Sequence, residues 1–232
     1  MKAVIDADSC IYRAAWKQGN LDMALDNYQN IMQMFWLQPT WADSRDSFIY
    51  CAGEGNFRNE LVPDYKANRR DKPIPEEAGL FKPLLDKIVE LGLAIPADGC
   101  EADDMVRMKC TELYEADEEF VCVHIDKDLD CIVGDHYNPN RKEFYHVGPE
   151  EADLHYWSQI LSGDPTDNLP GIPKIGPVRA KKLLEHTPYG ERKQRVITLY
   201  KYHLGASKWE EALNNTANGV HIWRYNNDYF QL

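Results

Sequence analysis

Carboxylate side chains occur in four short clusters along the sequence. Two clusters follow apolar runs typical of buried strands, one opens a helical pattern, and one lies in a polar turn. The clusters are Asp6 with Asp8, Glu101 with Asp103 and Asp104, Asp126 with Asp128, and Asp164 with Asp167. Their oxygens are the ligands that Mg²⁺ and Mn²⁺ prefer. Because gathered carboxylates repel one another unless cations intervene, the clusters predict a divalent metal site.

A pair of such metal ions suits one reaction in particular. Two Mg²⁺ ions about 4 Å apart favour phosphodiester cleavage, because one activates water and both stabilise the attacking and leaving oxygens. The carboxylate clusters therefore make a nucleic-acid hydrolase the first hypothesis to test against the rest of the sequence.

The last acidic cluster runs directly into a segment suited to phosphate binding. Residues 160–184 read ILSGDPTDNLPGIPKIGPVRAKKLL. Their prolines and glycines prevent one continuous helix, and the apolar spacing that follows predicts a helix beginning near Pro177. Glycines at a helix start let backbone N–H groups approach an anion, and the helix dipole favours negative charge there. We therefore expect a phosphate-binding hairpin beside the acidic turn.

The sheet that positions these groups is indicated by short apolar runs. Residues 3–5, 47–51 and 120–125 are typical of buried strands, and the first and third end in aspartates. In open α/β sheets the carboxyl ends of the strands hold the ligands. Further strands are expected at residues 93–96, 131–133 and 144–147, and Asp126 and Asp128 are expected to point the same way on extended chain. Helical spacing is found at residues 21–35, 80–91, 100–113, 196–204 and 209–213.

Composition limits the class of protein. The chain has 232 residues, 44% of them hydrophobic, which is enough for one domain or a domain with a subdomain. The net charge of −12 argues against DNA binding when only the sum is considered. Basic residues are locally clustered, however, as Lys66, Arg69, Arg70 and Lys72, and as Lys174, Arg179, Lys181 and Lys182. No apolar run approaches the roughly 20 residues of a membrane helix, so we expect a soluble intracellular protein.

The cysteines indicate a reducing compartment. Six cysteines occur without any CxxC pair, which is typical of reduced thiols in a cytosol. Cys122, His124, Cys131 and His136 offer zinc-type ligands, but their spacing fits no established zinc pattern. Burial in the core is the interpretation that we favour for them.

Five motifs in the sequence resemble motifs of a known family. In chain order they are IDADSCIYR, FRNELVPDYKANR, EADD, DKDLD and GDPTDNLPGIPKIG. They resemble the flap-endonuclease-like 5′ nucleases, particularly bacteriophage 5′–3′ exonucleases and the 5′ nuclease domain of bacterial DNA polymerase I, from about Val4 to Leu184. The resemblance implies an α/β fold with a mostly parallel central sheet flanked by helices, as in PIN-like nucleases, and a helix-hairpin-helix subregion. It divides the chain into a nuclease core at residues 1–154, with a short arch near 63–80, and a hairpin region at 155–232 packed on the core.

The resemblance also implies the activity. The protein would be a metal-dependent 5′–3′ exonuclease or structure-specific flap endonuclease, acting on DNA at or near 5′ ends in replication, repair or primer removal. Its implied cofactors are two Mg²⁺ or Mn²⁺ ions, with K⁺ at the hairpin. The implied partner is DNA with a free 5′ end or a flap, or an RNA–DNA hybrid. We expect a cytoplasmic monomer without membrane association, in the host cell if it is phage-encoded.

Individual residues take roles from the matching motifs. Lys66 and Arg69 match a basic pair at the base of the family's helical arch, which would stabilise charge on the scissile phosphate, and are catalytic candidates with Asp6 and Asp126. The implied metal ligands are Asp6, Glu101, Asp103, Asp104, Asp126, Asp128, Asp164 and Asp167. The implied DNA-contacting residues are Tyr12, Arg13, Arg58, Lys66, Arg69, Arg70, Gly171, Lys174, Gly176, Arg179 and Lys181.

Two departures from the family and three alternatives remain open. Cys51 stands where the family usually has an aspartate ligand, and a thiol is a poor Mg²⁺ ligand, so one metal would be held more weakly, keep an extra water or use Glu54. The segment between Arg69 and Glu101 leaves room only for a short arch. The alternatives are a haloacid-dehalogenase-like phosphatase with Asp6 as nucleophile, a catalytically weak branched-DNA-binding protein, and a PIN-type RNase.

Overall fold

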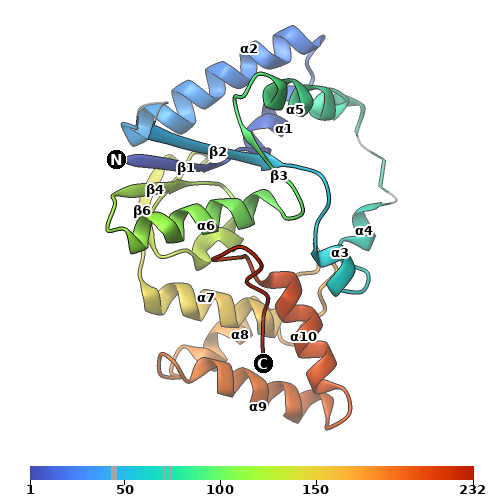
Figure 1. Cartoon of the computed structure of the whole chain (residues 1–232). Helices are drawn as coiled ribbons and strands as arrows, with labels where there is room; N and C mark the ends of the chain where they lie inside the picture. Colours follow the sequence, from blue (N-terminus) through green and yellow to red (C-terminus); the bar gives the residue numbers. More distant parts are fainter. Residues whose placement is uncertain (43–45, 71, 74) are drawn as a thin grey trace. The chain divides into compact units, whose positions relative to one another are not determined.

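The chain forms two compact units, each assembled from separate stretches of sequence (Figure 1). The computed structural model describes residues 1–42, 46–70, 72–73 and 75–232. Unit 1 comprises Met1–Asn56, Pro73–Val147 and Arg224–Asn226. Unit 2 comprises Phe57–Lys72, Gly148–Trp223 and Asn227–Leu232.

Unit 1 is built on a mixed, mostly parallel sheet, as the sequence predicts. Its strand order is β3-β2-β1-β4-β5-β6, and only the β5–β6 pair among the described strands is antiparallel. The strands are β1 (Lys2–Asp6), β2 (Ser47–Ala52), β3 (Ile95–Ala97), β4 (Phe120–Val123), β5 (Gly134–Asn138) and β6 (Glu143–Val147). The central strands are apolar from Ala3 to Ile5 in β1 and from Phe120 to Val123 in β4 because helices cover both faces of the sheet.

Helices flank this sheet on both sides (Figure 1). The helices α1 (Asp8–Ala15), α2 (Leu21–Ile31) and α5 (Phe81–Glu90) pack together on one face, where Ile5, Val121 and Val123 join their core. The helix α6 (Ala102–Glu115) packs on β1, β2 and β4 from the other face. Shorter helical turns are η1 (Met32–Leu37), η2 (Gln38–Thr40), η4 (Glu76–Ala78) and η5 (Lys127–Cys131).

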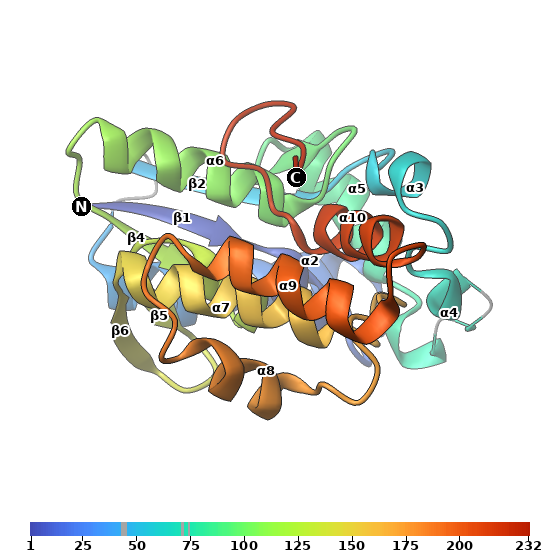
Figure 2. The same ribbon diagram turned by 90° about the horizontal axis from the view of Figure 1, so that it is seen from below.

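Unit 2 is helical in its described residues. Its elements are α3 (Arg58–Leu61), α4 (Ala67–Arg70), α7 (Pro149–Ser162), α8 (Pro177–Leu184), α9 (Arg192–Leu204) and α10 (Trp209–Val220). Figure 2 shows α7 and α9 running side by side, and α7 also packs on α8 and α10. Ile160, Ala180 and Tyr200 are fully buried in the core that these helices share. Helix α8 begins at Pro177, as the proline and glycine pattern predicts.

Two local predictions about the chain after β4 are wrong. Residues 127–131 form the 3₁₀ turn η5 rather than extended chain, because the Asp126 side chain accepts a hydrogen bond from Asp128 N at 2.9 Å and caps the turn. The next strand therefore begins at Gly134 and not at residue 131. Gly134 has φ 138°, and a Cβ there would lie 2.8 Å from Phe120 Cζ, so only glycine fits this strand start.

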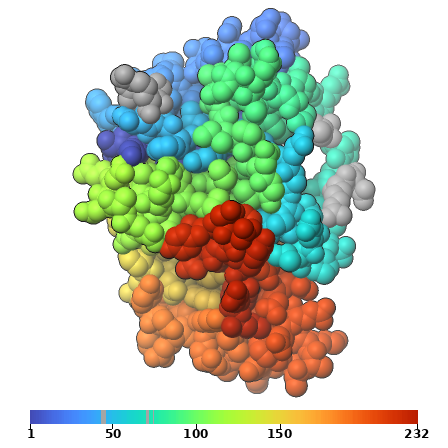
Figure 3. Space-filling view, viewed as in Figure 1, coloured from blue at the N-terminus to red at the C-terminus, as the bar shows by residue number. Residues whose placement is uncertain are grey.

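The segment expected to form an arch is divided between the units. Within residues 63–80, α4 belongs to unit 2 and η4 belongs to unit 1, while residues 71 and 74 lie outside the described residues. In the space-filling view the carboxyl-terminal residues, drawn in dark red, lie on the surface (Figure 3), and residues 224–227 are exposed. Among the described residues, no helix has the length and apolar character needed to cross a membrane.

Candidate functional site

Three predicted ligands from distant parts of the sequence meet in unit 1. Asp6 ends β1, Asp126 follows β4, and Asp103 lies in the first turn of α6. The strands β1 and β4 are parallel neighbours, so their carboxyl ends share one edge of the sheet. Asp103 interacts electrostatically with both Asp6 and Asp126, which places the three carboxylates in one cluster.

The electrostatics of this cluster disfavour full ionisation without a cation. Burial raises the pKa of Asp6 to about 8, and the negative charges of Asp8 and Asp126 add to the shift. Burial also raises the pKa of Asp103 well above its usual range, with further contributions from Asp6 and Asp126. Asp6 is only 6% exposed, so little water screens these repulsions.

Local hydrogen bonds fix the carboxylates at the ends of their elements. Asp6 Oδ1 accepts from Asp8 N at 3.2 Å, where α1 begins. Asp126 Oδ1 accepts from Asp128 N at the start of η5. Asp6 therefore ends β1 and Asp126 follows the end of β4, and each is held by the backbone of the turn that comes after it.

Asp8 also belongs to this cluster, although it is not among the metal ligands that we predict from the sequence. Its Oδ1 accepts from Ala52 N at 2.8 Å, and its charge is the largest electrostatic influence of a neighbouring group on both Asp6 and Cys51. The Asp-x-Asp spacing after β1 is the signal that points to it.

Cys51 lies beside the cluster as a buried thiol. It sits in β2, and its Sγ lies 3.7 Å from Ile95 O. Burial raises its pKa to about 12, and the negative charges of Asp8 and Asp6 contribute to the shift. The side chain is therefore a protonated thiol at neutral pH, which is a poor Mg²⁺ ligand.

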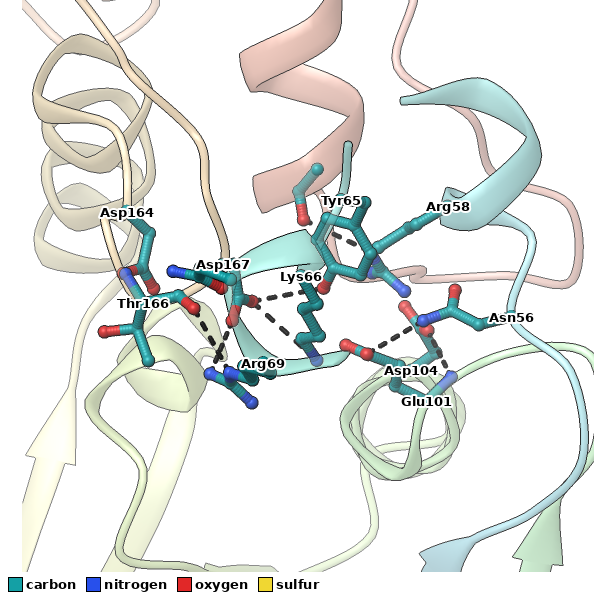
Figure 4. Close-up of polar contacts among 12 residues, drawn as sticks. Asn56, Arg58, Tyr65, Lys66, Arg69, Glu101, Asp104, Asp164, Thr166 and Asp167 are labelled. Atoms are coloured by element: carbon teal, nitrogen blue, oxygen red, sulfur yellow. Dashed lines mark hydrogen bonds and ion pairs between the residues drawn. The ribbon is translucent and has the colours of Figure 1, made fainter. Parts of the chain in front are cut away.

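Glu101 and Asp104 hold the start of α6 (Figure 4). They form a capping box, in which Asp104 Oδ2 accepts from Glu101 N at 2.9 Å. Glu101 Oε1 also accepts from Asn56 Nδ2 at 2.8 Å, and Asp104 is fully buried. These contacts fix the helical turn from which Asp103 projects.

Asp128 is half-buried in the first turn of η5.

In unit 2, a basic pair surrounds Asp167 (Figure 4). Arg69 Nη2 lies 2.6 Å from Asp167 Oδ1, and Lys66 Nζ lies 3.8 Å from Asp167 Oδ2. The Tyr65 hydroxyl donates to Asp167 Oδ2 at 3.1 Å. Asp167 therefore serves in this structure as the anion that gathers Lys66 and Arg69.

The acidic turn and the basic segment are joined along their backbones. Lys66 N donates to Asp167 O at 3.0 Å, and Arg69 Nε donates to Thr166 O at 3.1 Å. The Asp164 side chain accepts from Thr166 N at 2.8 Å and closes the turn. Lys66 adopts a left-handed conformation with φ 52°, which costs energy in a residue with a Cβ. These bonds explain why Phe57–Lys72 belongs to unit 2, although we expected it in the nuclease core.

The segment between α7 and α8 is a tight loop with an exposed basic rim. Gly163 and Gly171 have φ 68° and 59°, and a Cβ on Gly171 would lie 2.3 Å from Gly163 N. Glycine is thus required at position 171 because a larger residue would clash with neighbouring backbone atoms, and not because this position lies at an open surface. Around Gly176 the chain is open, since a Cβ there would meet no atom within 4 Å. The exposed basic residues of this rim are Lys174, Arg179 and Lys181.

The other predicted DNA contacts differ in accessibility. Tyr12 is 41% exposed on α1, and the neighbouring Arg13 is exposed and donates to Asn140 Oδ1. The assignment of Arg58 is not supported, because its side chain is 1% exposed and donates to Gly219 O and His221 O. The side chain of Arg70 lies outside the described residues.

The chain matches the family described as "5'-3' exonuclease, N-terminal resolvase-like domain" over residues 2–156. A 5'-3' exonuclease of Buchnera aphidicola subsp. Schizaphis graminum is 28% identical over 207 residues, which are 78% of this chain and 69% of the relative. The Flap endonuclease Xni of Shewanella oneidensis is 30% identical over 59% of this chain and 55% of its own length. The thermostable DNA polymerase I of Thermus aquaticus is 33% identical over 59% of this chain, but only 17% of the polymerase is spanned.

Solved structures agree on the fold. A structure of T5 5'-exonuclease with bound zinc superposes with a TM-score of 0.64 at 19% identity, and covers 94% of this chain and 86% of the other. The chain belongs to the 5′–3′ exonuclease family, which confirms the resemblance found in the sequence motifs and does not support the phosphatase alternative.

Proposed function

We propose that this protein is a divalent-metal-dependent 5′ nuclease that hydrolyses DNA at or near 5′ ends, as a 5′–3′ exonuclease or flap endonuclease. The observation that carries the proposal is the convergence of Asp6, Asp103 and Asp126 in unit 1, where burial, together with the neighbouring negative charges, raises the pKa of Asp6 and Asp103. All three offer oxygen ligands, so the donor set fits Mg²⁺ or Mn²⁺. Asp164 and Asp167 belong to unit 2 and stay predicted ligands.

The reaction class follows from these donors. Bound divalent ions would supply an activated water and charge stabilisation for phosphodiester hydrolysis. The chain's own contribution is to hold the carboxylates in place after β1 and β4, through the backbone N–H groups that donate to Asp6 and Asp126.

Lys66 and Arg69 are suited to binding the phosphate that reacts. Both cations are held by Asp167 and by backbone bonds, so a phosphate oxygen that displaces the Asp167 carboxylate meets two positioned donors. Arg69 offers planar, charge-assisted hydrogen bonds, and Lys66 offers a mobile point charge. Preorganised cations of this kind stabilise the charge that develops on a phosphate during hydrolysis.

The exposed rim of Lys174, Arg179 and Lys181 is suited to the DNA backbone. Gly176 precedes Pro177 at the start of α8, and its open surroundings let a phosphate approach the backbone. Contacts of this kind position a duplex without reading its bases. A helix-hairpin-helix motif with bound K⁺, action on RNA–DNA hybrids, a monomeric state and a cytoplasmic location stay predictions.

One experiment tests the proposal directly. A flapped duplex labelled at both ends is incubated with the protein, with and without Mg²⁺, and the products are separated by size. We expect Mg²⁺-dependent shortening from the 5′ end, and a loss of several orders of magnitude in turnover for Asp126→Asn. Asp86→Asn is the matched control, since Asp86 is an exposed α5 carboxylate paired with Lys82. Tight binding of the flap without any cleavage would instead identify a branched-DNA-binding protein.

A further inference from the structure

A second group of ligand atoms lies in unit 1, and it contains no member of the acidic cluster. One sulfur and two ring nitrogens, from Cys122, His124 and His136, all lie within 4.8 Å of one another. The three side chains are at most 1% exposed. Buried histidine pairs are costly unless their polar atoms are satisfied, so this arrangement requires a physical explanation.

The sheet register brings these residues together. Cys122 of β4 and His136 of β5 are directly paired, and His136 is paired with Tyr145 of β6. His124 lies two residues beyond Cys122, on the same side of the strand. The Cys122 side chain also lies within hydrogen-bond reach of Cys110 on α6. The three side chains therefore lie next to one another on the face of the sheet that α6 covers.

The outward nitrogens of both rings are committed to the backbone. His124 Nδ1 lies 2.5 Å from Asp126 O, and His136 Nε2 lies 3.0 Å from Ile132 O. A carbonyl oxygen only accepts, so each of these nitrogens carries the ring's hydrogen. In neutral rings the remaining nitrogens, His124 Nε2 and His136 Nδ1, then both present lone pairs, and they face each other at 2.7 Å. The Tyr145 hydroxyl also lies 3.3 Å from His124 Nε2, but it donates to Asp130 Oδ1. Two lone pairs at 2.7 Å repel each other unless a proton or a metal ion lies between them.

We propose that Cys122, His124 and His136 bind a structural zinc ion. Zinc-binding histidines characteristically donate their second N–H to a backbone carbonyl or a carboxylate, which is the pattern that both rings show. A cysteine sulfur selects zinc over Mg²⁺. Zinc–nitrogen bonds of ~2.0 Å at a tetrahedral angle need nitrogens ~3.3 Å apart, so the rings separate by roughly 0.6 Å from their present 2.7 Å.

Asp130 is suited to complete the site. Its Oδ1 lies 4.0 Å from His124 Nε2 and accepts from the Tyr145 hydroxyl at 2.7 Å. One thiolate and one carboxylate neutralise the two charges of zinc, which a buried site requires. Binding of zinc to the folded metal-free protein releases to solvent both the Cys122 thiol proton and the proton shared by His124 and His136, and forms the zinc–sulfur bond with no change of oxidation state.

A zinc ion at this site would stabilise the end of β4, next to Asp126 of the nuclease cluster. The N–H of His124 holds the carbonyl of Asp126, so a metal that fixes the His124 ring also fixes the backbone of Asp126. Zinc would join β4 and β5 at the edge where the carboxylates gather. This role is independent of the nuclease chemistry, and it can be tested by metal content and spectroscopy alone.

The first test uses the unmodified protein. The full chain is produced in zinc-supplemented medium, purified without chelator, dialysed against excess Mg²⁺ to clear carboxylate-bound zinc, and analysed for metal. We expect one zinc ion per chain. A folded protein free of zinc after this procedure overturns the proposal and leaves a proton shared between His124 and His136.

The second test identifies the ligands. Co²⁺ in place of zinc gives intense visible absorption in a tetrahedral site and a near-ultraviolet charge-transfer band when a thiolate is bound. Cys122→Ser should abolish the charge-transfer band. Cys131→Ser should keep it, because the buried Cys131 does not belong to the group. Near-ultraviolet circular dichroism checks that each variant folds, and His136→Gln, which keeps the thiolate, should weaken the visible absorption. A charge-transfer band that survives Cys122→Ser contradicts the proposal.

Discussion

Replacing Gly171 with alanine is expected to destabilise unit 2 strongly, whereas replacing Gly176 is expected to destabilise it only slightly. Gly171 has φ 59°, a left-handed conformation that costs a residue with a Cβ about 1–2 kcal/mol. Its new Cβ would lie 2.3 Å from Gly163 N and 2.4 Å from Ser162 C, both of them backbone atoms. Overpacking of that kind costs about 1–3 kcal/mol. The two effects together predict a loss of roughly 2–5 kcal/mol, out of a total of about 5–15 kcal/mol for a typical domain.

Gly176→Ala is the matched control for this prediction. Gly176 has φ −85°, and an added methyl group would meet no atom within 4 Å, so the cost is only the loss of a good helix cap, about 0.5–1 kcal/mol. If a phosphate binds the open backbone at Gly176, the added methyl should remove one charge-assisted hydrogen bond, about 1.5 kcal/mol, or roughly tenfold in Kd.

The assays separate folding from binding. Urea unfolding followed by circular dichroism gives the free energy of unfolding for both variants, and a fluorescent flapped duplex gives Kd in Ca²⁺, which supports binding without turnover in many metal-dependent nucleases. A Gly171→Ala protein as stable as the parent would refute the packing argument. Unchanged DNA affinity in Gly176→Ala would remove the start of α8 from the proposed interface.

Three further predictions concern charge. Lys66→Ala should lower the rate of cleavage by about 10²–10³ with a smaller change in Kd, and equal losses in single-turnover rate and affinity would argue against a role in the transition state. Arg179→Ala should weaken duplex binding and reduce the salt dependence of log Kd by about one, whereas an unchanged slope in a salt titration would exclude a phosphate contact. Because the pKa of Asp6 is raised to about 8, the folded metal-free protein holds a proton that the unfolded chain loses near pH 4. Its stability should fall as the pH rises from 4 to 8, and Mg²⁺ should restore it; urea midpoints at pH 5 and pH 8 that do not differ would contradict this.

The sequence predicts the acidic cluster because its position depends only on local rules. A buried run that ends in an aspartate places the carboxylate at a strand end, and parallel strands put those ends at one edge. Asp6 and Asp126 therefore meet without any knowledge of the register between β1 and β4. Asp103 joins them because the start of a helix that packs on these strands lies at the same edge.

Other features depend on long-range contacts that no local pattern contains. Arg58 is read as a DNA-binding residue because it stands in a basic motif, yet its partners lie in Gly219 and His221, more than 160 residues away. Cys122 and His136 are 14 positions apart and meet only because β4 and β5 pair in this register. Sequence patterns for zinc motifs do not detect ligands on paired strands, since those patterns describe ligands that are close together along the chain.

The distribution of charge reconciles an acidic chain with a DNA substrate. The net charge of −12 sums 38 acidic and 26 basic residues over the whole chain, so it does not exclude local clusters of cations. In unit 2 the carboxylate of Asp167 contacts both Lys66 and Arg69. A phosphate that replaces Asp167 at this pair exchanges one anion for another, so the net gain in binding comes from counterions set free from the DNA. Affinity should therefore depend on salt through the exposed rim of Lys174, Arg179 and Lys181, while Lys66 and Arg69 contribute chiefly to the rate.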